Sequence, residues 1–142
     1  MVYKRKKRLV ISCVCFGVIA LLYLSCNFDK IQTAISLKLN WNIDMPCNET
    51  IYNCSKDRIS YYVCKISPYQ QRKISQLLIE REVGPTTVKN VMSELQEIGV
   101  NKDQYPLFDT IDYSLKKTKR LSHLYLLYSS DSSILYIIEF LD

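Results

Sequence analysis

The sequence predicts an α+β protein, with an N-terminal transmembrane helix followed by a small extracytoplasmic domain. In that domain a helical hairpin packs on a C-terminal three-stranded antiparallel meander. Three observations predict this class: an uncharged apolar run from Leu9 to Phe28, helical periodicity between Ser67 and Gly99, and period-two patterning beyond Leu107. We divide the chain into a basic stub (1–8), an anchor (9–28), a stalk with a cysteine-containing loop (29–66) and the α+β domain (67–142).

The apolar run has the length of a membrane span. It carries no charge over about twenty residues, which as a helix rise about 30 Å, the thickness of a bilayer's hydrocarbon core. The residues just before it are basic: Lys4, Arg5, Lys6, Lys7 and Arg8. Because such clusters stay on the cytoplasmic side, we expect a single-pass inner-membrane protein with a periplasmic C-terminal domain. We interpret the run as an uncleaved anchor. A lipoprotein signal cut before Cys26 and a cleaved secretory signal are the alternatives, and both export the same domain.

Net charge argues against a nucleic-acid partner. The basic cluster accounts for the whole formal charge of +5, so the exported part is near neutral and has no basic footprint. Two helices joined at Gly84-Pro85, the second beginning Thr86-Thr87-Val88-Lys89, do resemble a helix-turn-helix in a generic way. The predicted location of the domain opposes that interpretation, and we expect no nucleic acid.

Cysteine usage fits an oxidising compartment. Of six cysteines, Cys13 and Cys15 lie inside the apolar run. The others are disulfide candidates: Cys26, Cys47, Cys54 and Cys64. We predict at least one disulfide among the last three and leave the pairing open. Their spacing matches no paired-cysteine zinc pattern, and we expect no metal or other cofactor.

The stalk and loop are the least regular part of the sequence. Phe28, Ile31, Ile35 and Leu39 share one helical face, which we expect to pack on the outer domain or to lie on the membrane surface. Residues 41–66 contain turn formers and two glycosylation sequons, at Asn48 and Asn53, whose use stays open. We predict a loop here, with a short extended piece near Ile59 to Ile66.

Two amphipathic helices follow. Ser67 is a good N-cap, Pro68 suits the first helical position, and Gln70 completes a capping box. The first helix is predicted to stop at Gly84-Pro85, and the second to start at Thr86 or Thr87 and end at Gly99. The apolar stripe of the second helix consists of Val88, Val91, Met92, Leu95 and Ile98.

Three strands are predicted at the C-terminus, near 107–115, 123–128 and 134–141, separated by polar turns. The last two carry apolar rows made of Leu124, Leu126 and Tyr128, and of Leu135, Ile137 and Leu141. One hairpin covers only one face of a sheet, so we expect these rows to meet the stalk, a small apolar ligand or a partner chain. The last strand is predicted to be a free edge and part of a heteromeric interface or a shared ligand pocket.

Catalytic chemistry is not indicated. The single histidine, His123, has no cysteine or carboxylate cluster beside it in the sequence, and the three glycines form no phosphate-binding loop. We expect a protein that is not an enzyme.

The layout of basic stub, single span and small α+β outer domain resembles the accessory partners of membrane-bound, ToxR-like transcription regulators. The resemblance lies in architecture and involves no residue motif. It implies a domain that stabilises or regulates the partner's sensory domain, with a possible shared apolar ligand. The alternative is an immunity protein against a bacteriocin or secreted effector acting in the periplasm, which the near-neutral domain disfavours. The partner's identity is not encoded in any feature of the sequence.

Overall fold

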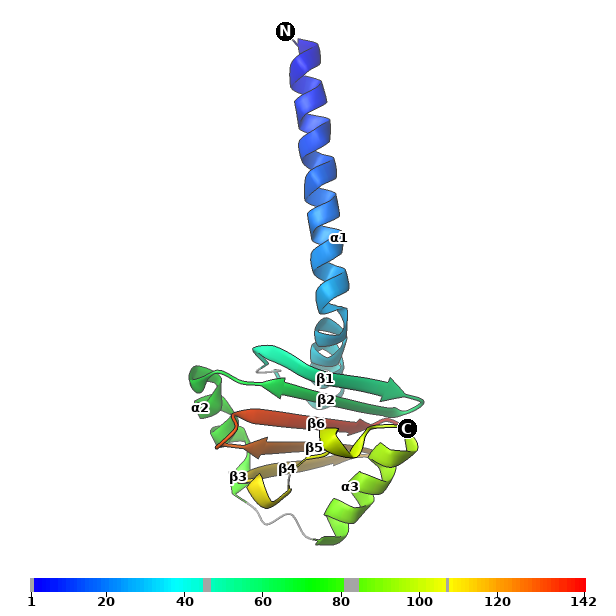
Figure 1. The fold of residues 1–142 in the computed structure, drawn as a ribbon, viewed down its shortest axis with the longest axis vertical. Coiled ribbons are helices and arrows are strands. Elements are labelled where there is room, and N and C mark those ends of the chain that lie inside the picture. The colour runs from blue at the N-terminus through cyan, green and yellow to red at the C-terminus, as the bar shows by residue number, and fades with distance from the viewer. Residues whose placement is uncertain (1, 45–46, 81–84, 107) are drawn as a thin grey trace.

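A long N-terminal helix and one antiparallel sheet make up the fold (Figure 1). The computed structural model describes residues 2–44, 47–80, 85–106 and 108–142. The predicted α+β class and the long apolar N-terminal helix are confirmed. The predicted three-stranded meander is incomplete, because its strands belong to a sheet of six strands.

Helix α1 runs unbroken from Val2 to Trp41. From Cys13 onward it is long and apolar enough to cross a membrane, and its most apolar stretch of 18 residues is not buried by any of the residues that the structure describes. The helix ends where Asn42 takes a left-handed conformation (φ 54°), which Asn tolerates better than most residues. The N–H groups of Asn42 and Ile43 then donate to the carbonyls of Lys38 and Leu37, at 3.1 and 3.2 Å. The anchor helix therefore continues well past the charged residues at its predicted outer boundary.

The sheet has the order β1-β2-β6-β5-β4-β3, and all neighbours are antiparallel. Its strands are β1 (Glu49–Lys56), β2 (Ile59–Lys65), β3 (Ile79–Glu80), β4 (Tyr113–Lys119), β5 (Ser122–Ser129) and β6 (Ile134–Phe140). The predicted extended piece near residues 59–66 is β2, but the predicted loop before it is the edge strand β1. The region predicted as a cysteine-containing loop thus contributes β1 and β2 to the sheet.

Strand β6 is a central strand, so its prediction as a free edge is wrong. It pairs with β2 on one side and with β5 on the other, over its full length. The edges are instead the long β1 and the two-residue β3. The predicted polar turn at 116–120 was also placed too early: β4 continues to Lys119, and Arg120 makes the turn with φ 56°. Lysines are tolerated in β4 because only the two-residue β3 covers its outer side.

Helices α2 (Pro68–Leu77) and α3 (Pro85–Glu97) lie on opposite faces of the sheet, so they do not form the predicted hairpin on one face (Figure 1). The capping box at the start of α2 is confirmed: the Gln70 N–H donates to Ser67 Oγ, and the Ser67 N–H donates to the Gln70 side chain. Strand β3 follows α2 and leads the chain toward the other face. The predicted continuation of the first helix to Gly84 is wrong, because α2 ends at Leu77 and Ile79–Glu80 form β3; residues 81–84 lie outside the described set. This arrangement also excludes a helix-turn-helix.

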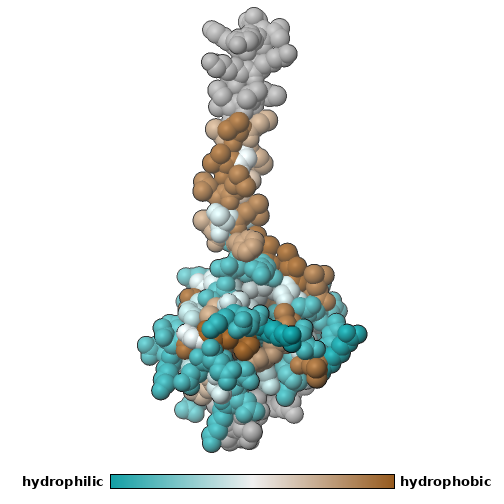
Figure 2. All heavy atoms as spheres, turned by 90° about the vertical axis from the view of Figure 1, so that its right-hand side faces the viewer, coloured by the Kyte–Doolittle hydropathy of each residue, from teal (hydrophilic) through white to brown (hydrophobic). Residues whose placement is uncertain are grey.

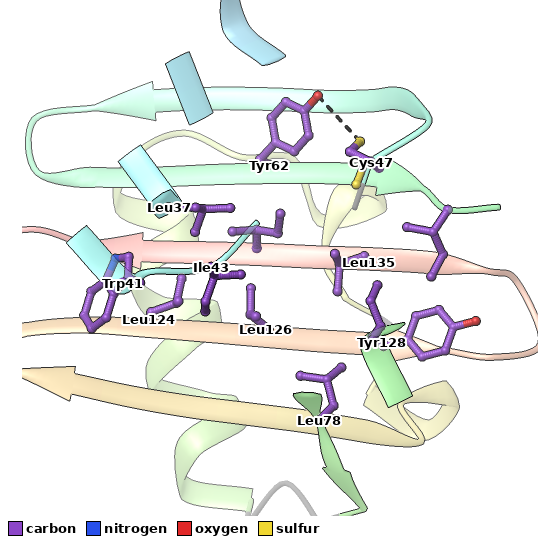
Figure 3. Packing of buried hydrophobic residues seen from close by; sticks show 14 residues of the cluster. Leu37, Trp41, Ile43, Cys47, Tyr62, Leu78, Leu124, Leu126, Tyr128 and Leu135 are labelled. Carbon is purple, nitrogen blue, oxygen red and sulfur yellow. Dashed lines mark hydrogen bonds between the residues drawn. The ribbon is translucent and has the colours of Figure 1, made fainter. Parts of the chain in front are cut away.

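Two apolar cores result, one on each face. The first contains the end of α1, α2 and the inward side chains of β2, β5 and β6 (Figure 3). The second lies under α3, whose predicted stripe is buried at Val91, Leu95 and Ile98. Residues in β2 alternate between the two: Tyr62 and Cys64 face the first core, and Tyr61 and Val63 face the second. Because the centre of the sheet is buried on both faces, β5 and β6 carry apolar side chains on both sides, and Glu139 is the charged exception in β6.

Candidate functional site at the helix–sheet joint

The point where α1 meets the sheet is built around a buried carboxylate. Glu139 of β6 is 2% exposed and accepts hydrogen bonds from three side chains of α1. Trp41 Nε1 donates to Oε1 at 2.6 Å, Asn40 Nδ2 to Oε1 at 3.3 Å, and Ser36 Oγ to Oε2 at 2.8 Å. We call these four residues the helix–sheet joint. Because a buried carboxylate is costly unless it is hydrogen-bonded, this set of donors is what allows Glu139 to occupy the core.

Two lysines from β4 strengthen the same joint. Lys117 Nζ donates to the carbonyl of Trp41, and Lys119 Nζ donates to that of Asn40, each at 3.4 Å. Carbonyls in the last turn of a helix lack partners within the helix and carry the negative end of its dipole, which cations stabilise. The end of α1 is therefore held by polar contacts from two strands as well as by apolar packing.

The face of α1 that packs on the sheet differs from the predicted stripe. Leu37 and Trp41 are buried, and Thr33 is buried one turn earlier (Figure 3). Phe28, Ile35 and Leu39 instead remain 61%, 52% and 75% exposed. The predicted packing on the domain is wrong for these three residues, because α1 turns its polar Ser36 and Asn40 toward Glu139, whereas Ile31 of the same stripe is half-buried. The alternative, in which the stripe lies on the membrane surface, stays a prediction. Figure 2 shows the resulting apolar surface, which runs along the helix and onto the adjoining part of the domain.

All but one of the predicted interface residues lie in the first core, the exception being Leu141. Leu124, Leu126, Tyr128, Leu135 and Ile137 are at most 5% exposed, and Leu141 is half-buried. Of the three coverings predicted for these rows, the structure provides the stalk: α1, the segment after it and α2 pack on them (Figure 3). The prediction that these rows form an open surface for a heteromeric partner is therefore wrong.

The same residues leave no room for a ligand. The cavity that Leu126, Leu135 and Ile137 help to line measures about 10 Å³. That volume is close to the space of a single water probe. The first core is thus close-packed at the place where the sequence suggested a shared apolar pocket.

A polar cavity of about 160 Å³ lies between α1 and the β1–β2 hairpin. Asp29, Gln32 and Ser36 line it on the helix side, and Asn53 and Arg58 line it on the hairpin side, with Glu139 at its inner end. Asn53 Oδ1 is buried without a hydrogen-bond partner. Arg58 is engaged by Asp142 at 3.2 Å. In the part of the chain that the structure describes, no group of three metal-ligating side chains is present.

The cysteines are divided between the two faces of the sheet. Cys47 and Cys64 belong to the first core, whereas Cys54 packs against the second and lies 3.9 Å from the carbonyl of Ile98. Cys26 is exposed on α1. No disulfide joins any of the six, all of which are free thiols.

Other predicted residues take structural positions. His123 is half-buried and lies opposite Thr118, whose Oγ1 is 3.2 Å from its Nδ1. The backbone of Lys4–Arg8 belongs to the first turns of α1, while the side chains lie outside the described set. Asn48 is exposed and Asn53 half-buried.

Comparison with protein-family models, curated proteins and solved structures gives no match. The site therefore rests on its own geometry. Sequence reasoning missed Glu139, although a signal existed: it is the only charged residue in the apolar run 134–141. A single carboxylate in a strand that is otherwise apolar requires buried donors.

Proposed function

We propose that the chain is a single-pass inner-membrane protein with its N-terminus in the cytoplasm and its α+β domain in the periplasm. Its function is to bind and stabilise the membrane-proximal part of a membrane-bound, ToxR-like transcription regulator. The predicted architecture supports this proposal, and one structural observation carries it: the row of exposed apolar residues on the outer part of α1.

That row continues the apolar surface of the predicted span. Leu21 and Leu24 are 68% and 51% exposed, and Phe28, Ile35 and Leu39 follow on the part of the helix beyond the span. The steps from Leu21 to Leu24 and from Leu24 to Phe28 are three and four residues, and Ile35 follows seven residues after Phe28, which is the heptad spacing of a helix–helix seam. Water-exposed apolar side chains gain free energy when another surface covers them, since burial is favourable by about 25 cal/mol per Å².

The position of the row specifies the kind of partner. It begins inside the predicted span and ends where α1 joins the sheet, so a second helix can cover it only if that helix is anchored in the same membrane. The helix–sheet joint holds the domain on α1 through Glu139, which fixes the row in place relative to the domain. A single-pass regulator provides such a helix together with its juxtamembrane segment.

The test uses photocrosslinking in intact cells. A photoreactive phenylalanine replaces Leu39 in one variant and Leu121 in a control. Leu121 is 72% exposed, like Leu39, but lies in the β4–β5 turn and is not part of the apolar row on α1. We expect the Leu39 variant to yield an adduct with a single-pass regulator, identified by mass spectrometry, and the Leu121 variant to yield none.

A second pair of variants measures the function itself. Leu39→Asp is expected to lower the steady-state level of the regulator, while Leu121→Asp leaves it unchanged. Both positions are exposed, so each substitution should change the stability of the chain by no more than about 0.5 kcal/mol. Equal adducts at both positions, or a secreted toxin in the Leu39 adduct, would overturn the proposal. The toxin result would support the immunity function instead.

Topology needs its own measurement, because the accessory function requires a periplasmic domain. Alkaline phosphatase, which is active only outside the cytoplasm, is fused after Asp142 of the full chain. Activity of this fusion is expected, and activity of a matching cytoplasm-only reporter would contradict the assigned orientation.

A further inference from the structure

Cys47 and Cys64 meet at the junction of α1 and the sheet. Cys47 lies between the end of α1 and the start of β1, and Cys64 is the penultimate residue of β2. The N–H of Asn48 donates to the carbonyl of Lys65 at 3.0 Å, so the two cysteines flank one inter-strand hydrogen bond. Both are buried in the same core, with Cys47 3.8 Å from the hydroxyl of Tyr62 (Figure 3).

The two thiols are close enough for each to shift the pKa of the other, that of Cys47 downward and that of Cys64 upward. To form a disulfide the sulfurs have to approach from this contact to about 2.05 Å. The backbone on both sides is already fixed by pairing of Glu49 with Lys65 and of Thr50 with Cys64. The pair is therefore brought together by the fold itself.

Cys54 is excluded from this pair by the pleat of the sheet. It packs against the core under α3, on the face opposite Cys47 and Cys64. Side chains on opposite faces of a sheet cannot be bridged without moving the backbone. Cys47 and Cys64 therefore form a neighbouring pair, and Cys54 is a separate thiol on the other face.

The chemistry of the two thiols differs. The hydrogen bond from Cys64, followed by the Tyr62 hydroxyl and the charge of Lys30, lowers the pKa of Cys47. The hydrogen bond with Cys47 and burial raise the pKa of Cys64. Because the thiolate is the nucleophile in exchange, Cys47 is the sulfur that reacts first. It is also the more accessible, at 7% exposed against 0% for Cys64.

We propose that Cys47 and Cys64 are a disulfide-forming pair, oxidised by exchange with a low-molecular-weight or protein disulfide, and that Cys54 stays reduced. The Cys47 thiolate attacks one sulfur of the oxidant and releases the other as a thiolate, which gives a mixed disulfide. Cys64 then loses its proton and attacks the Cys47 sulfur, releasing the second thiolate. The two cysteines together lose two electrons and two protons, and the oxidant disulfide becomes two thiols.

Oxidation would attach the segment that follows α1 covalently to β2. The helix–sheet joint would then be supported by a covalent link as well as by the Glu139 hydrogen bonds. The domain would then resist separation from α1 more strongly in the oxidised form than in the reduced form.

The experiment uses the full chain purified in detergent, so its result does not depend on the location or partner proposed above. The reduced chain is incubated without denaturant in an excess of oxidised glutathione, quenched with acid, alkylated and mapped by mass spectrometry. We expect a peptide in which Cys47 is joined to Cys64, with Cys54 recovered in the alkylated form.

Two variants control the assignment. Cys54→Ser should give the same linked peptide in the same yield, and Cys64→Ser should abolish it without creating a link to Cys54. Recovery of both Cys47 and Cys64 as alkylated thiols, or links of either to Cys54, would overturn the proposal. The wild-type map decides the question even if a serine variant folds poorly.

Discussion

Replacing Glu139 tests whether the helix–sheet joint stabilises the domain. Two changes separate its charge from its hydrogen-bonding capacity. Glu139→Gln keeps the shape and one acceptor oxygen, and Glu139→Leu removes every acceptor. In the wild type the carboxylate accepts from Ser36, Asn40 and Trp41.

The expected magnitudes follow from these contacts. Hydrogen bonds to a charged group contribute about 1.5–3 kcal/mol each and neutral ones about 0.5–1.5, so Glu139→Gln should cost about 1 kcal/mol for each bond that it keeps in neutral form. Glu139→Leu leaves the buried Trp41 Nε1–H without an acceptor, and each such group costs about 1–3 kcal/mol. Counting Ser36 and Asn40, which are partly exposed, we expect a total loss of at least about 3 kcal/mol.

The assay is urea unfolding of the full chain in micelles, followed by tryptophan fluorescence. Trp41 is the only tryptophan and is 6% exposed, so its emission reports directly on the joint. Glu97→Gln and Glu97→Leu serve as matched controls because Glu97 is exposed at the end of α3, and both should stay within about 0.5 kcal/mol. If Glu139→Leu unfolds at the wild-type urea concentration, the hydrogen bonds contribute nothing net and the reasoning fails.

Three further predictions concern other parts of the domain. Ile137→Ala, at a side chain 1% exposed, should cost about 2–5 kcal/mol, and a stable variant defective only in partner binding would restore its interpretation as an interface residue. Ser67→Ala should cost about 1 kcal/mol in thermal unfolding because α2 loses its N-cap, and an unchanged midpoint would count against that role. Hydrogen bonds from the hydroxyl and N–H of Ser130 lower the pKa of Asp112 below its ordinary value near 3.8. This stabilisation is present above that ordinary value and is lost as pH falls through the lower folded pKa, with a small effect because Asp112 is exposed. Ser130→Ala should move the pKa of Asp112 back upward in a carboxyl NMR titration, and no movement would refute the assignment.

The elements best predicted from the sequence are those whose signals are local. Ser67 and Gln70 fix the start of α2 through hydrogen bonds between neighbours in the chain. Alternation and turn residues located β5 and β6, and Gly99, with φ 86°, follows the end of α3 as expected. In each case the relevant contact lies within a few residues.

The arrangement of these elements depends on distant contacts, and there the predictions failed. Strand β1 has an exposed outer edge and contains Asn53 and Ser55, so its composition resembles a loop. It becomes a strand because β2 pairs with it and supplies partners for its backbone hydrogen bonds. Likewise, the two-residue β3 is too short to leave a pattern, yet it separates α2 from α3 and allows them to cover opposite faces.

The candidate site shows the same limit. A helix rich in apolar residues gives several plausible stripes, and apolarity alone selected Phe28, Ile35 and Leu39. The structure selects the other side, because Glu139 requires Ser36, Asn40 and Trp41 as donors. Which face of α1 packs is thus decided by one carboxylate about a hundred residues away, as the sequence separations of 98 to 103 residues show.

Helix α1 is continuous, so a movement of its N-terminal part is passed on to the sheet. Its 40 residues extend over about 60 Å, with no proline inside and its end clamped to the sheet. Transmembrane helices tilt by about 20° on average, and the angle responds to the thickness of the bilayer. If α1 spans a membrane as proposed, any change of its tilt would swing the whole sheet, because the helix–sheet joint fixes the end of α1 to β6. Rotation of the helix by one residue position would likewise turn the domain by about 100° about the same axis.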